Sequence, residues 1–384
     1  MPDDARLHLA YFGNGRSYHV HKWLPALAEQ GLRVSLFTFH PPDAPLEGVE
    51  VGVLRPAFHA SAERMTWIDF AAPAGPLRRL LRERAVDVLM PSYATSYGWM
   101  GLRTGFDPII VNTWTYDVSV YPFEGLRRFL FRPLVGRVLR RARAVLTDGG
   151  ALADFVRAHY RLPAEKVVPA LWGIRLADYP FTPGLRAEAR AARGIPPEAP
   201  VVISARGVSD WYAPAQVLPA FRRLLDARPD AHVIVLTLEH ERSAGTQALL
   251  DALAAHPRAH VVDRFLTKPE MCAAWAAADV LVSVPPHDGI SVGILEGMYA
   301  GAIPVVSDIP SNRSFLDPDR AFFVPTGDAE ALNETLLRVL AGLPKLKVEL
   351  APGNRAWVRE HASVESTARQ VAALVRRVAA ERAS

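Results

Sequence analysis

The stretch that most constrains the fold of this chain is 280–307, which predicts a strand, a loop, a helix and a second strand. Two short apolar runs, 280–284 and 302–307, have the composition of buried strands. Between them, Ser291 is the expected N-cap of a helix, and Gly301 stands where left-handed backbone ends helices. A glycine loop that leads into a helix N-terminus can hold an anion through backbone N–H groups and the helix dipole. The stretch therefore predicts an α/β fold with a ligand site.

Two carboxylates frame this site. Asp288 lies in the loop, and Glu296 lies eight residues later among apolar helix residues. Gly293 and Gly297 leave little bulk near Glu296 at helical spacing, so that a ligand can approach it. Its carboxylate could accept two hydrogen bonds from the vicinal hydroxyls of a ribose. Alternatively, Glu296 pairs with a neighbouring arginine, and the small residues only allow tight helix-on-sheet packing.

The segment HDGISVGILEGMYAGAIPVVSDIPSN resembles the donor site of retaining family 4 glycosyltransferases, which are group 1 enzymes with the GT-B fold. In that family an acidic residue, seven others and a Glu bracket the nucleotide-sugar. Asp288 and Glu296 take these positions in the variant that begins with Asp. The resemblance implies that Glu296 binds the ribose and that the sugar is oriented by Asp288 with the loop residues Gly289, Ile290, Ser291 and Val292.

Arg206, which follows a predicted strand at 201–204, matches the family's pyrophosphate-binding arginine. A guanidinium is planar, permanently charged and bidentate, and so suits phosphate. The resemblance implies a catalytic set of Arg206, Asp288 and Glu296. Tyr212 stands in the nucleotide-sugar site where the family usually has a lysine, so one cation is missing there. The alternative for Arg206 is an ordinary surface arginine.

The first strand–loop–helix–strand unit, over 7–39, opens a separate α/β series. It lacks the third glycine and the acidic residue of a dinucleotide fingerprint, since Tyr18 takes the place of the glycine. The segment GRSYHVHKW instead resembles the family's first loop and helix, with Gly15 where backbone approaches donor phosphate or acceptor. His19 takes the position of the family's His at the helix start, and it could equally be a histidine with no ligand.

Two later segments of the first half are similar to the family's acceptor side. SYATSYGWM follows a predicted strand at 86–90, and Thr-Trp-Thr-Tyr-Asp follows another at 109–112. Trp114 replaces a frequent family His, so an imidazole is lacking at this position. These segments predict an acceptor pocket lined by Tyr93, Thr95, Ser96, Tyr97, Trp114 and Asp117.

Composition and length are consistent with two domains. The chain has 384 residues, half of them hydrophobic. We expect an N-terminal acceptor domain over 1–180, a Pro-, Gly- and Ala-rich linker at 179–200, and a donor domain over 190–366. Terminal helices, about 367–384, are expected to cross back to the first domain. The fold class that the resemblance implies is α/β, with two Rossmann-like domains facing across a cleft.

The single cysteine, Cys272, excludes an intramolecular disulfide and fits a reducing cytoplasm. No secretion signal and no long uncharged apolar window is evident, so we expect a cytoplasmic protein. Asp317-Pro318-Asp319 lies in a proline turn, and no cluster with metal-ligand spacing is found, so no metal is expected. No cofactor is expected either, since the nucleotide-sugar is a substrate.

The segment 123–143 alternates apolar residues with seven arginines, and Pro133 is expected to interrupt it. Such a basic amphipathic segment suits an anionic membrane surface, and equally a solvated face. Nucleic acid is not expected, because 44 basic residues oppose 40 acidic ones and no aromatic platform accompanies the charge.

The resemblance spans nearly the whole chain and implies a retaining, metal-independent glycosyltransferase. It would move a sugar from a nucleotide-diphosphate-sugar to a hydroxyl of a glycan, a lipid-linked acceptor or a small molecule. Two alternatives are a GT-B sugar-nucleotide epimerase and a glycosyltransferase-like protein that binds nucleotide-sugar but has lost turnover.

Overall fold

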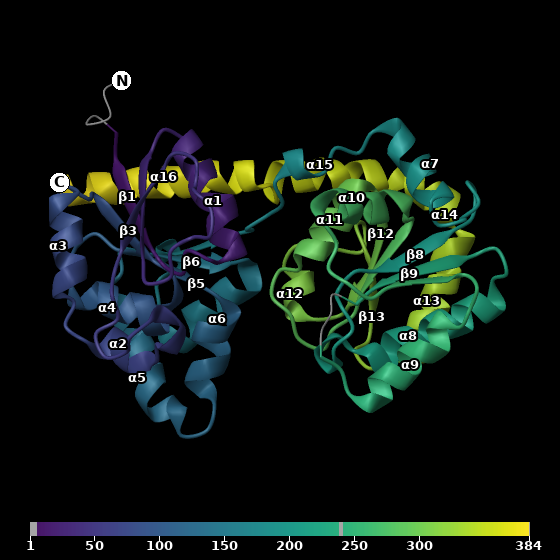
Figure 1. Cartoon of the computed structure of the whole chain (residues 1–384), viewed down its shortest axis with the longest axis horizontal. Helices are drawn as coiled ribbons and strands as arrows, with labels where there is room; N and C mark the ends of the chain where they lie inside the picture. Colours follow the sequence, from purple (N-terminus) through teal and green to yellow (C-terminus); the bar gives the residue numbers. More distant parts are fainter. Residues whose placement is uncertain (1–5, 238–240, 384) are drawn as a thin grey trace. The chain divides into compact units, whose positions relative to one another are not determined.

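The computed structural model describes residues 6–237 and 241–383, and the chain divides into two compact units. The first unit contains the residues up to Trp172 together with those from Val364 onward, and the second is Gly173–Ser363. Each unit has a central parallel sheet covered by helices on both faces (Figure 1). The prediction of two Rossmann-like halves is confirmed.

The strands of the first unit are β1 (His8–Phe12), β2 (Arg33–Thr38), β3 (Val49–Val53), β4 (Val88–Pro91), β5 (Ile110–Thr113), β6 (Ala144–Asp148) and β7 (Val167–Ala170). Its helices are α1 (Tyr18–Glu29), α2 (Trp67–Ala71), α3 (Gly75–Glu83), α4 (Gly98–Arg103), α5 (Arg127–Arg141), α6 (Gly150–Tyr160) and α16 (Val364–Ala383).

These strands run parallel in the orders β3-β2-β1-β4 and β5-β6-β7. Two parallel bridges, Leu89 to Ile109 and Ser92 to Asn112, connect the β4 edge to the β5 edge. The chain leaves β1 toward β2 on one side and later returns to β4 on the other. Strand order therefore reverses between β1 and β4, and ligands of open α/β sheets bind beyond the carboxyl ends of strands at such a point.

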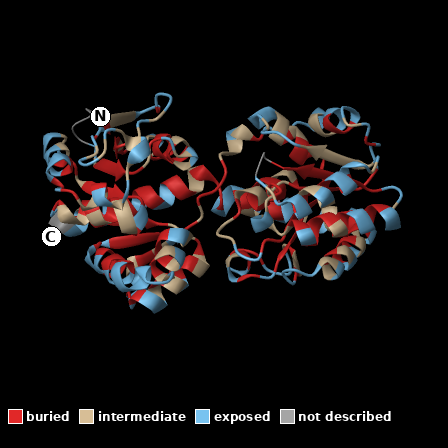
Figure 2. Cartoon of the chain, turned by 60° about the horizontal axis from the view of Figure 1, so that its bottom comes forward, coloured by how far each residue is buried: buried red, intermediate tan, exposed pale blue. Residues whose placement is uncertain are grey.

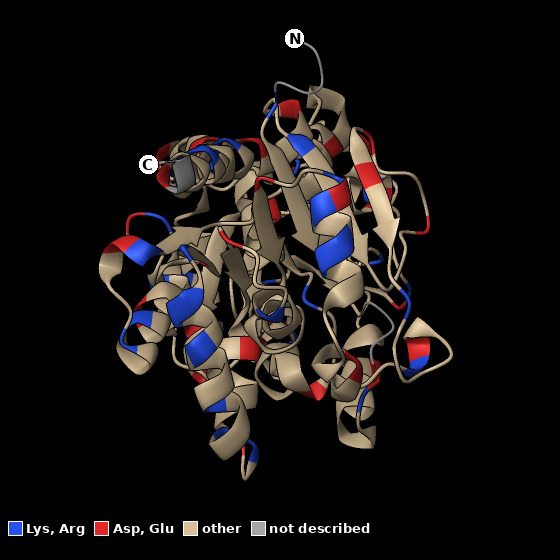
Figure 3. Ribbon diagram, turned by 90° about the vertical axis from the view of Figure 1, so that its left-hand side faces the viewer, with Lys and Arg blue, Asp and Glu red and all other residues tan. Residues whose placement is uncertain are grey.

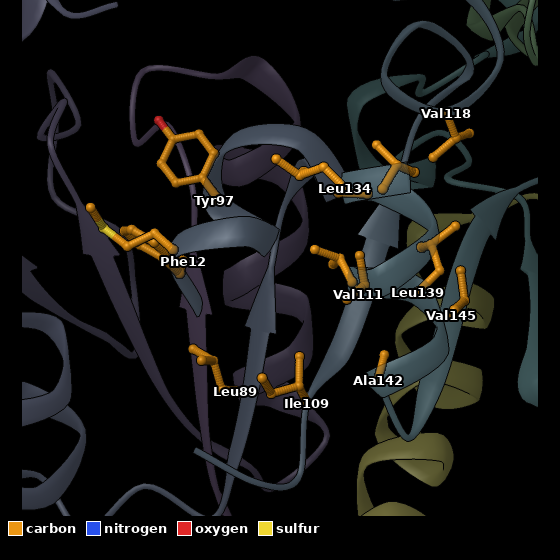
Figure 4. Close-up of a cluster of buried hydrophobic side chains, with 14 of the residues drawn as sticks. Phe12, Leu89, Tyr97, Ile109, Val111, Val118, Leu134, Leu139, Ala142 and Val145 are labelled. Atoms are coloured by element: carbon orange, nitrogen blue, oxygen red, sulfur yellow. The ribbon is translucent and has the colours of Figure 1, made fainter. Parts of the chain in front are cut away.

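The core of the first unit lies on both faces of this sheet. On one face, Leu89 of β4, Val111 of β5 and Val145 of β6 belong to one buried cluster with Leu139 of α5 (Figure 4). On the other face, α1 and α16 pack against each other and against the strands. Figure 2 shows most strands buried and the outer sides of the helices exposed, while the edge strand β3 is only partly buried. The sheet thus forms a rigid base for the loops at its carboxyl edge.

The strands of the second unit are β8 (Val201–Ser204), β9 (His232–Leu236), β10 (Ala259–Val262), β11 (Val280–Ser283), β12 (Ile303–Ser307) and β13 (Phe322–Val324). Its helices are α7 (Pro183–Ala191), α8 (Pro214–Ala227), α9 (Ala244–Ala254), α10 (Lys268–Ala277), α11 (Val292–Ala300), α12 (Pro310–Arg313), α13 (Ala329–Ala341), α14 (Leu343–Glu349) and α15 (Ala351–His361). The parallel order β10-β9-β8-β11-β12-β13 places the reversal of strand order between β8 and β11.

The interpretation of 179–200 as a linker is wrong, because this segment contains α7 and is anchored in the second unit. Arg190 of α7 is 2% exposed, and its guanidinium donates to the Asp279 carboxylate at 2.6 Å. Arg186 donates to the other carboxylate oxygen at the same distance. The Pro, Gly and Ala content that suggested a linker thus says nothing of these two arginines, which anchor the segment.

The expectation that Pro133 interrupts the basic segment is also wrong, since α5 continues through it. Proline removes one backbone N–H from the helix ladder and crowds the carbonyl four residues earlier. Pro133 is exposed and lies on the outer side of the helix, where water can hydrate that carbonyl.

Candidate functional site

The loop between β11 and α11 has the predicted geometry. Ser291 is the N-cap of α11, and its hydroxyl accepts a hydrogen bond from the Ile294 N–H at 3.4 Å. Gly301, with φ of +88°, ends the helix in left-handed backbone. The loop leaves β11 next to β8, so the N-terminus of α11 lies where strand order reverses in the second unit.

Arg206, Asp288 and Ser291 come together at this point. Arg206 follows β8, and its guanidinium donates to Asp288 Oδ2 at 2.6 Å and to Ser291 Oγ at 2.9 Å. Tyr212 places its ring 4.7 Å from the Arg206 guanidinium carbon. An aromatic face attracts a cation, so the Tyr212 ring helps to hold the Arg206 guanidinium in position. The sequence alone, in which Tyr212 replaces the family's lysine, did not suggest this role.

Arg206 and Asp288 form an ion pair, but one hydrogen-bond donor of this cluster has no partner among the residues that the structure describes. Burial raises the pKa of Asp288, while Arg206 and the Gly289 N–H lower it in part. Arg206 Nε is buried and has no hydrogen-bond partner within the described residues. A buried guanidinium N–H without a partner is costly, so the cluster is suited to an additional acceptor such as a phosphate oxygen.

Glu296 is buried on α11, 8% exposed, and both of its carboxylate oxygens have partners. The Tyr179 hydroxyl donates to Oε1, and Trp275 Nε1 donates to Oε2 at 3.0 Å. Lys268 Nζ in turn donates to the Tyr179 hydroxyl at 3.0 Å. Within the described residues no arginine pairs with Glu296, so the alternative of an arginine partner is wrong.

The small residues beside Glu296 have different surroundings. A Cβ on Gly297 would lie 2.3 Å from Leu281 and 2.9 Å from Trp275, so close helix packing requires this glycine. A Cβ on Gly293 would come no closer than 3.8 Å to any atom, and Arg206 is one of its nearest neighbours. A methyl group would therefore fit at Gly293, on the side of Arg206, but not at Gly297.

The first unit has a pocket of about 460 Å³ at the carboxyl ends of β1, β4 and β5. Six residues expected at the acceptor side line it, namely Tyr93, Thr95, Ser96, Tyr97, Trp114 and Asp117. Tyr116, which replaces a family Ser and was expected to add bulk to this wall, lines it too, and the lining residues that sequence reasoning missed are Tyr11, Asn14, Ser17, Val20, Trp67, Ser92 and Tyr121. Trp67 lies on α2, in a segment without any motif, so no local signal could have placed it here.

Tyr93 begins the loop after β4 with a φ of +69°. Left-handed backbone is costly for a residue with a bulky side chain, and such residues cluster at functional sites. The conformation turns the ring toward the rings of Tyr97 and Trp114, with both centroid distances at 6.4 Å. An aromatic wall results.

Asp117 is the charged residue in the lining of this pocket. Its carboxylate accepts from the Ala94 N–H at 2.5 Å and from the Trp114 N–H at 2.6 Å, so it joins the loops after β4 and β5. Burial raises the pKa of Asp117 to about 7, against the opposing effect of these two N–H groups.

His19 and Gly15 do not line the pocket. His19 packs against Trp23 and Trp114, and burial, with a smaller effect of Lys22, lowers its pKa to about 4, so it is neutral at pH 7. The Gly15 N–H donates to the His40 carbonyl at 2.9 Å, and a Cβ on Gly15 would lie 2.5 Å from that oxygen. The close backbone approach at Gly15 is thus to this neighbouring loop.

Two family models match the chain. The model described as Glycosyl transferase 4-like matches residues 8–149, and the model described as Glycosyl transferases group 1 matches residues 200–342. A curated relative, D-inositol 3-phosphate glycosyltransferase of Saccharomonospora viridis, is 31% identical over 205 residues. That alignment covers 51% of this chain and 46% of the relative, so the chain spans about half the length of this relative.

Solved structures of low sequence identity share the fold. A glycosyltransferase from Rickettsia africae superposes with a TM-score of 0.78 at 12% identity, covering 97% of this chain and 99% of the other. Anabaena HepE in complex with UDP gives 0.76 at 14% identity, covering 97% and 100%. These likenesses establish the GT-B fold.

Proposed function

Because the chain belongs to the glycosyltransferases that these two family models describe, we propose that it transfers a sugar from a nucleoside diphosphate sugar to an acceptor hydroxyl. The observation that carries this proposal is the cluster of Arg206, Asp288 and Ser291 at the N-terminus of α11. It combines a guanidinium with a buried, unpartnered N–H and a helix N-terminus, both of which suit a diphosphate. The structure of HepE with UDP-glucose, a protein of the same fold, supports a donor of this class.

Within this proposal, Arg206 neutralises the diphosphate leaving group, and Tyr212 holds the guanidinium in place. Asp288 and the loop residues 289–292 orient the sugar. Glu296 accepts hydrogen bonds from the ribose hydroxyls, which would share the carboxylate with Tyr179 and Trp275. The bond between the anomeric carbon and the diphosphate oxygen breaks, a bond to the acceptor oxygen forms, and the proton of the acceptor hydroxyl passes to the departing diphosphate. Retention of anomeric configuration and independence of metal are part of the proposal.

The test is release of nucleoside diphosphate from a panel of UDP-, GDP-, ADP- and TDP-sugars, with a mixture of saccharide acceptors and with EDTA in a parallel arm. We expect at least one donor to be consumed faster with acceptor than without, at a rate that EDTA does not change. No turnover of any donor would contradict the transferase proposal. Loss in EDTA that Mg²⁺ or Mn²⁺ restores would contradict metal independence alone.

We also propose that the start of α5 contacts an anionic membrane surface. Leu126, Phe129 and Leu130 are 86%, 68% and 57% exposed, and Arg127 and Arg128 lie among them. Figure 3 shows basic positions along the helices of the first unit. Exposed apolar side chains flanked by arginines suit the boundary between acyl chains and headgroups. Within the described residues no helix has the length and apolar character to cross a bilayer.

A further inference from the structure

The pocket of the first unit has an unusual lining for a site on a basic protein. Among the described residues that line it are seven aromatic rings, and neither a lysine nor an arginine. The remaining lining is mostly neutral and polar, with the hydroxyls of Ser17, Ser92, Thr95 and Ser96 and the amide of Asn14. Asp117 is the one acidic side chain among these lining residues, and burial raises its pKa to about 7, so the described lining offers no positive charge.

The aromatic lining offers flat faces rather than a closed apolar slot. The rings of Tyr93 and Tyr97 are inclined by 30°, and those of Tyr116 and Tyr121 lie 5.8 Å apart at 47°. Tyr116 is 56% exposed, so its ring is accessible at the mouth. The face of an aromatic ring is electron-rich and attracts the weakly positive C–H groups of a sugar ring, while hydroxyls and amides pair with the sugar hydroxyls.

Two basic side chains that adjoin the lining already have partners. Arg127 lies over the Tyr121 ring at 4.8 Å and pairs with Glu124 at 3.1 Å. Arg16 pairs with Glu63 at 3.1 Å. A phosphate in the pocket would therefore lose water without gaining a counter-charge, which is strongly unfavourable.

We propose that this pocket binds the acceptor as an uncharged saccharide and discriminates against phosphorylated sugars. The inference rests on the proposed function and names its acceptor class. It also separates this chain from the curated relative, whose name specifies an inositol phosphate. Stacking on Tyr116 and Tyr93 supplies the affinity, and the absence of a cation from the described lining supplies the selectivity.

The test measures direct binding to the full chain without donor, by saturation-transfer NMR and tryptophan fluorescence, since Trp67 and Trp114 line the pocket. Glucose, maltose and myo-inositol are compared with glucose 6-phosphate and inositol 3-phosphate. We expect at least one neutral saccharide to bind about tenfold or more tightly than its phosphorylated counterpart. Tyr116→Ala should weaken that binding, and Phe58→Ala, which removes an exposed ring outside the pocket, should not.

A second variant tests the origin of the selectivity. Ser96→Arg adds a cation to the lining and should narrow or invert the preference for the neutral sugar. Equal or tighter binding of the phosphorylated sugars to the wild type would overturn the proposal, as would no binding by any neutral saccharide or no effect of Tyr116→Ala. Because donor turnover is measured separately, failure here with intact donor turnover contradicts only the acceptor class.

Discussion

The Glu296 carboxylate already accepts hydrogen bonds from Tyr179 and Trp275, and in the proposed complex it also accepts from the donor ribose. Glu296→Gln keeps the shape but loses the charge and one acceptor. We expect donor affinity to fall by ~1.5–3 kcal/mol, the range for a hydrogen bond to a charged group. The free energy of unfolding should fall less, by ~1 kcal/mol, because the amide oxygen can still accept from Trp275 and the amide N–H can donate to the Tyr179 hydroxyl.

Both quantities are measured on the same variant, nucleotide-sugar affinity by calorimetry and stability by urea unfolding. Glu334→Gln, an exposed glutamate on α13 of the same unit, controls for the loss of one negative charge. A destabilised Glu296→Gln protein with unchanged donor affinity would end the assignment of Glu296 to the donor site.

Asp117 predicts a pH dependence of stability. Burial raises its pKa to about 7 from 3.8, so between these pH values the folded chain holds a proton that the unfolded chain has released. The stability contributed by this group is full below about pH 4 and falls as pH rises toward 7, by ~1.4 kcal/mol per pH unit. The difference in unfolding free energy between wild type and Asp117→Asn should therefore shrink or reverse across this range. A constant difference would contradict the buried, protonated carboxyl.

At the scale of elements, the contact of α11 with β11 is the closest packing near the donor cluster. Gly297→Ala adds a Cβ that meets Leu281 and Trp275, so we expect a loss of ~1–3 kcal/mol despite the better helix propensity of alanine. Gly353→Ala on α15 is the matched control, since no atom lies within 4 Å of its Cβ position, and it should gain up to ~1 kcal/mol. Urea unfolding of both variants checks this, and equal effects would contradict the packing.

The proposed contact of α5 with an anionic membrane is tested by measuring binding of the protein to liposomes that contain phosphatidylglycerol. Replacing Arg127 and Arg128 with Gln should weaken binding about thirtyfold, since each basic residue contributes ~1 kcal/mol near an anionic surface. Arg79 and Arg82, exposed on α3 of the same unit, provide the matched double replacement and should have little effect. If both double variants bind as the wild type does, α5 is a solvated helix.

Local sequence signals were sufficient for the elements around the donor cluster. Ser291 and Gly301 could be recognised as the ends of α11 because capping depends on local groups. The Ser291 hydroxyl accepts from an N–H three residues later, and Gly301 itself adopts the left-handed backbone. Composition misled for 179–200, because the Pro, Gly and Ala content suggested a linker while the burial of Arg190 depends on Asp279, a residue far along the chain. The expectation that Pro133 interrupts its segment failed because a proline on the exposed face of a helix can be tolerated.

For the whole molecule, short apolar runs alternate with helical patterns along the chain. This alternation was sufficient to predict two α/β halves, each with a parallel sheet. The residues that contact the site residues could not be predicted from the sequence. Tyr179 and Glu296 are 117 positions apart, and Trp67 reaches the pocket from a segment with no motif. Such contacts are set by tertiary packing, which a single sequence read by local patterns does not reveal.

The central claim is that the Arg206 cluster holds a nucleoside diphosphate sugar, and calorimetric titration of the donor panel tests it most directly. We predict that at least one donor binds the wild type and that Arg206→Ala weakens it by ~1.5–3 kcal/mol, or about 10- to 150-fold. Arg222→Ala, which removes an exposed guanidinium paired with Asp226 on α8, should leave the affinity unchanged. Failure of every donor to bind, or equal affinity of the Arg206→Ala variant and the wild type, would contradict the claim.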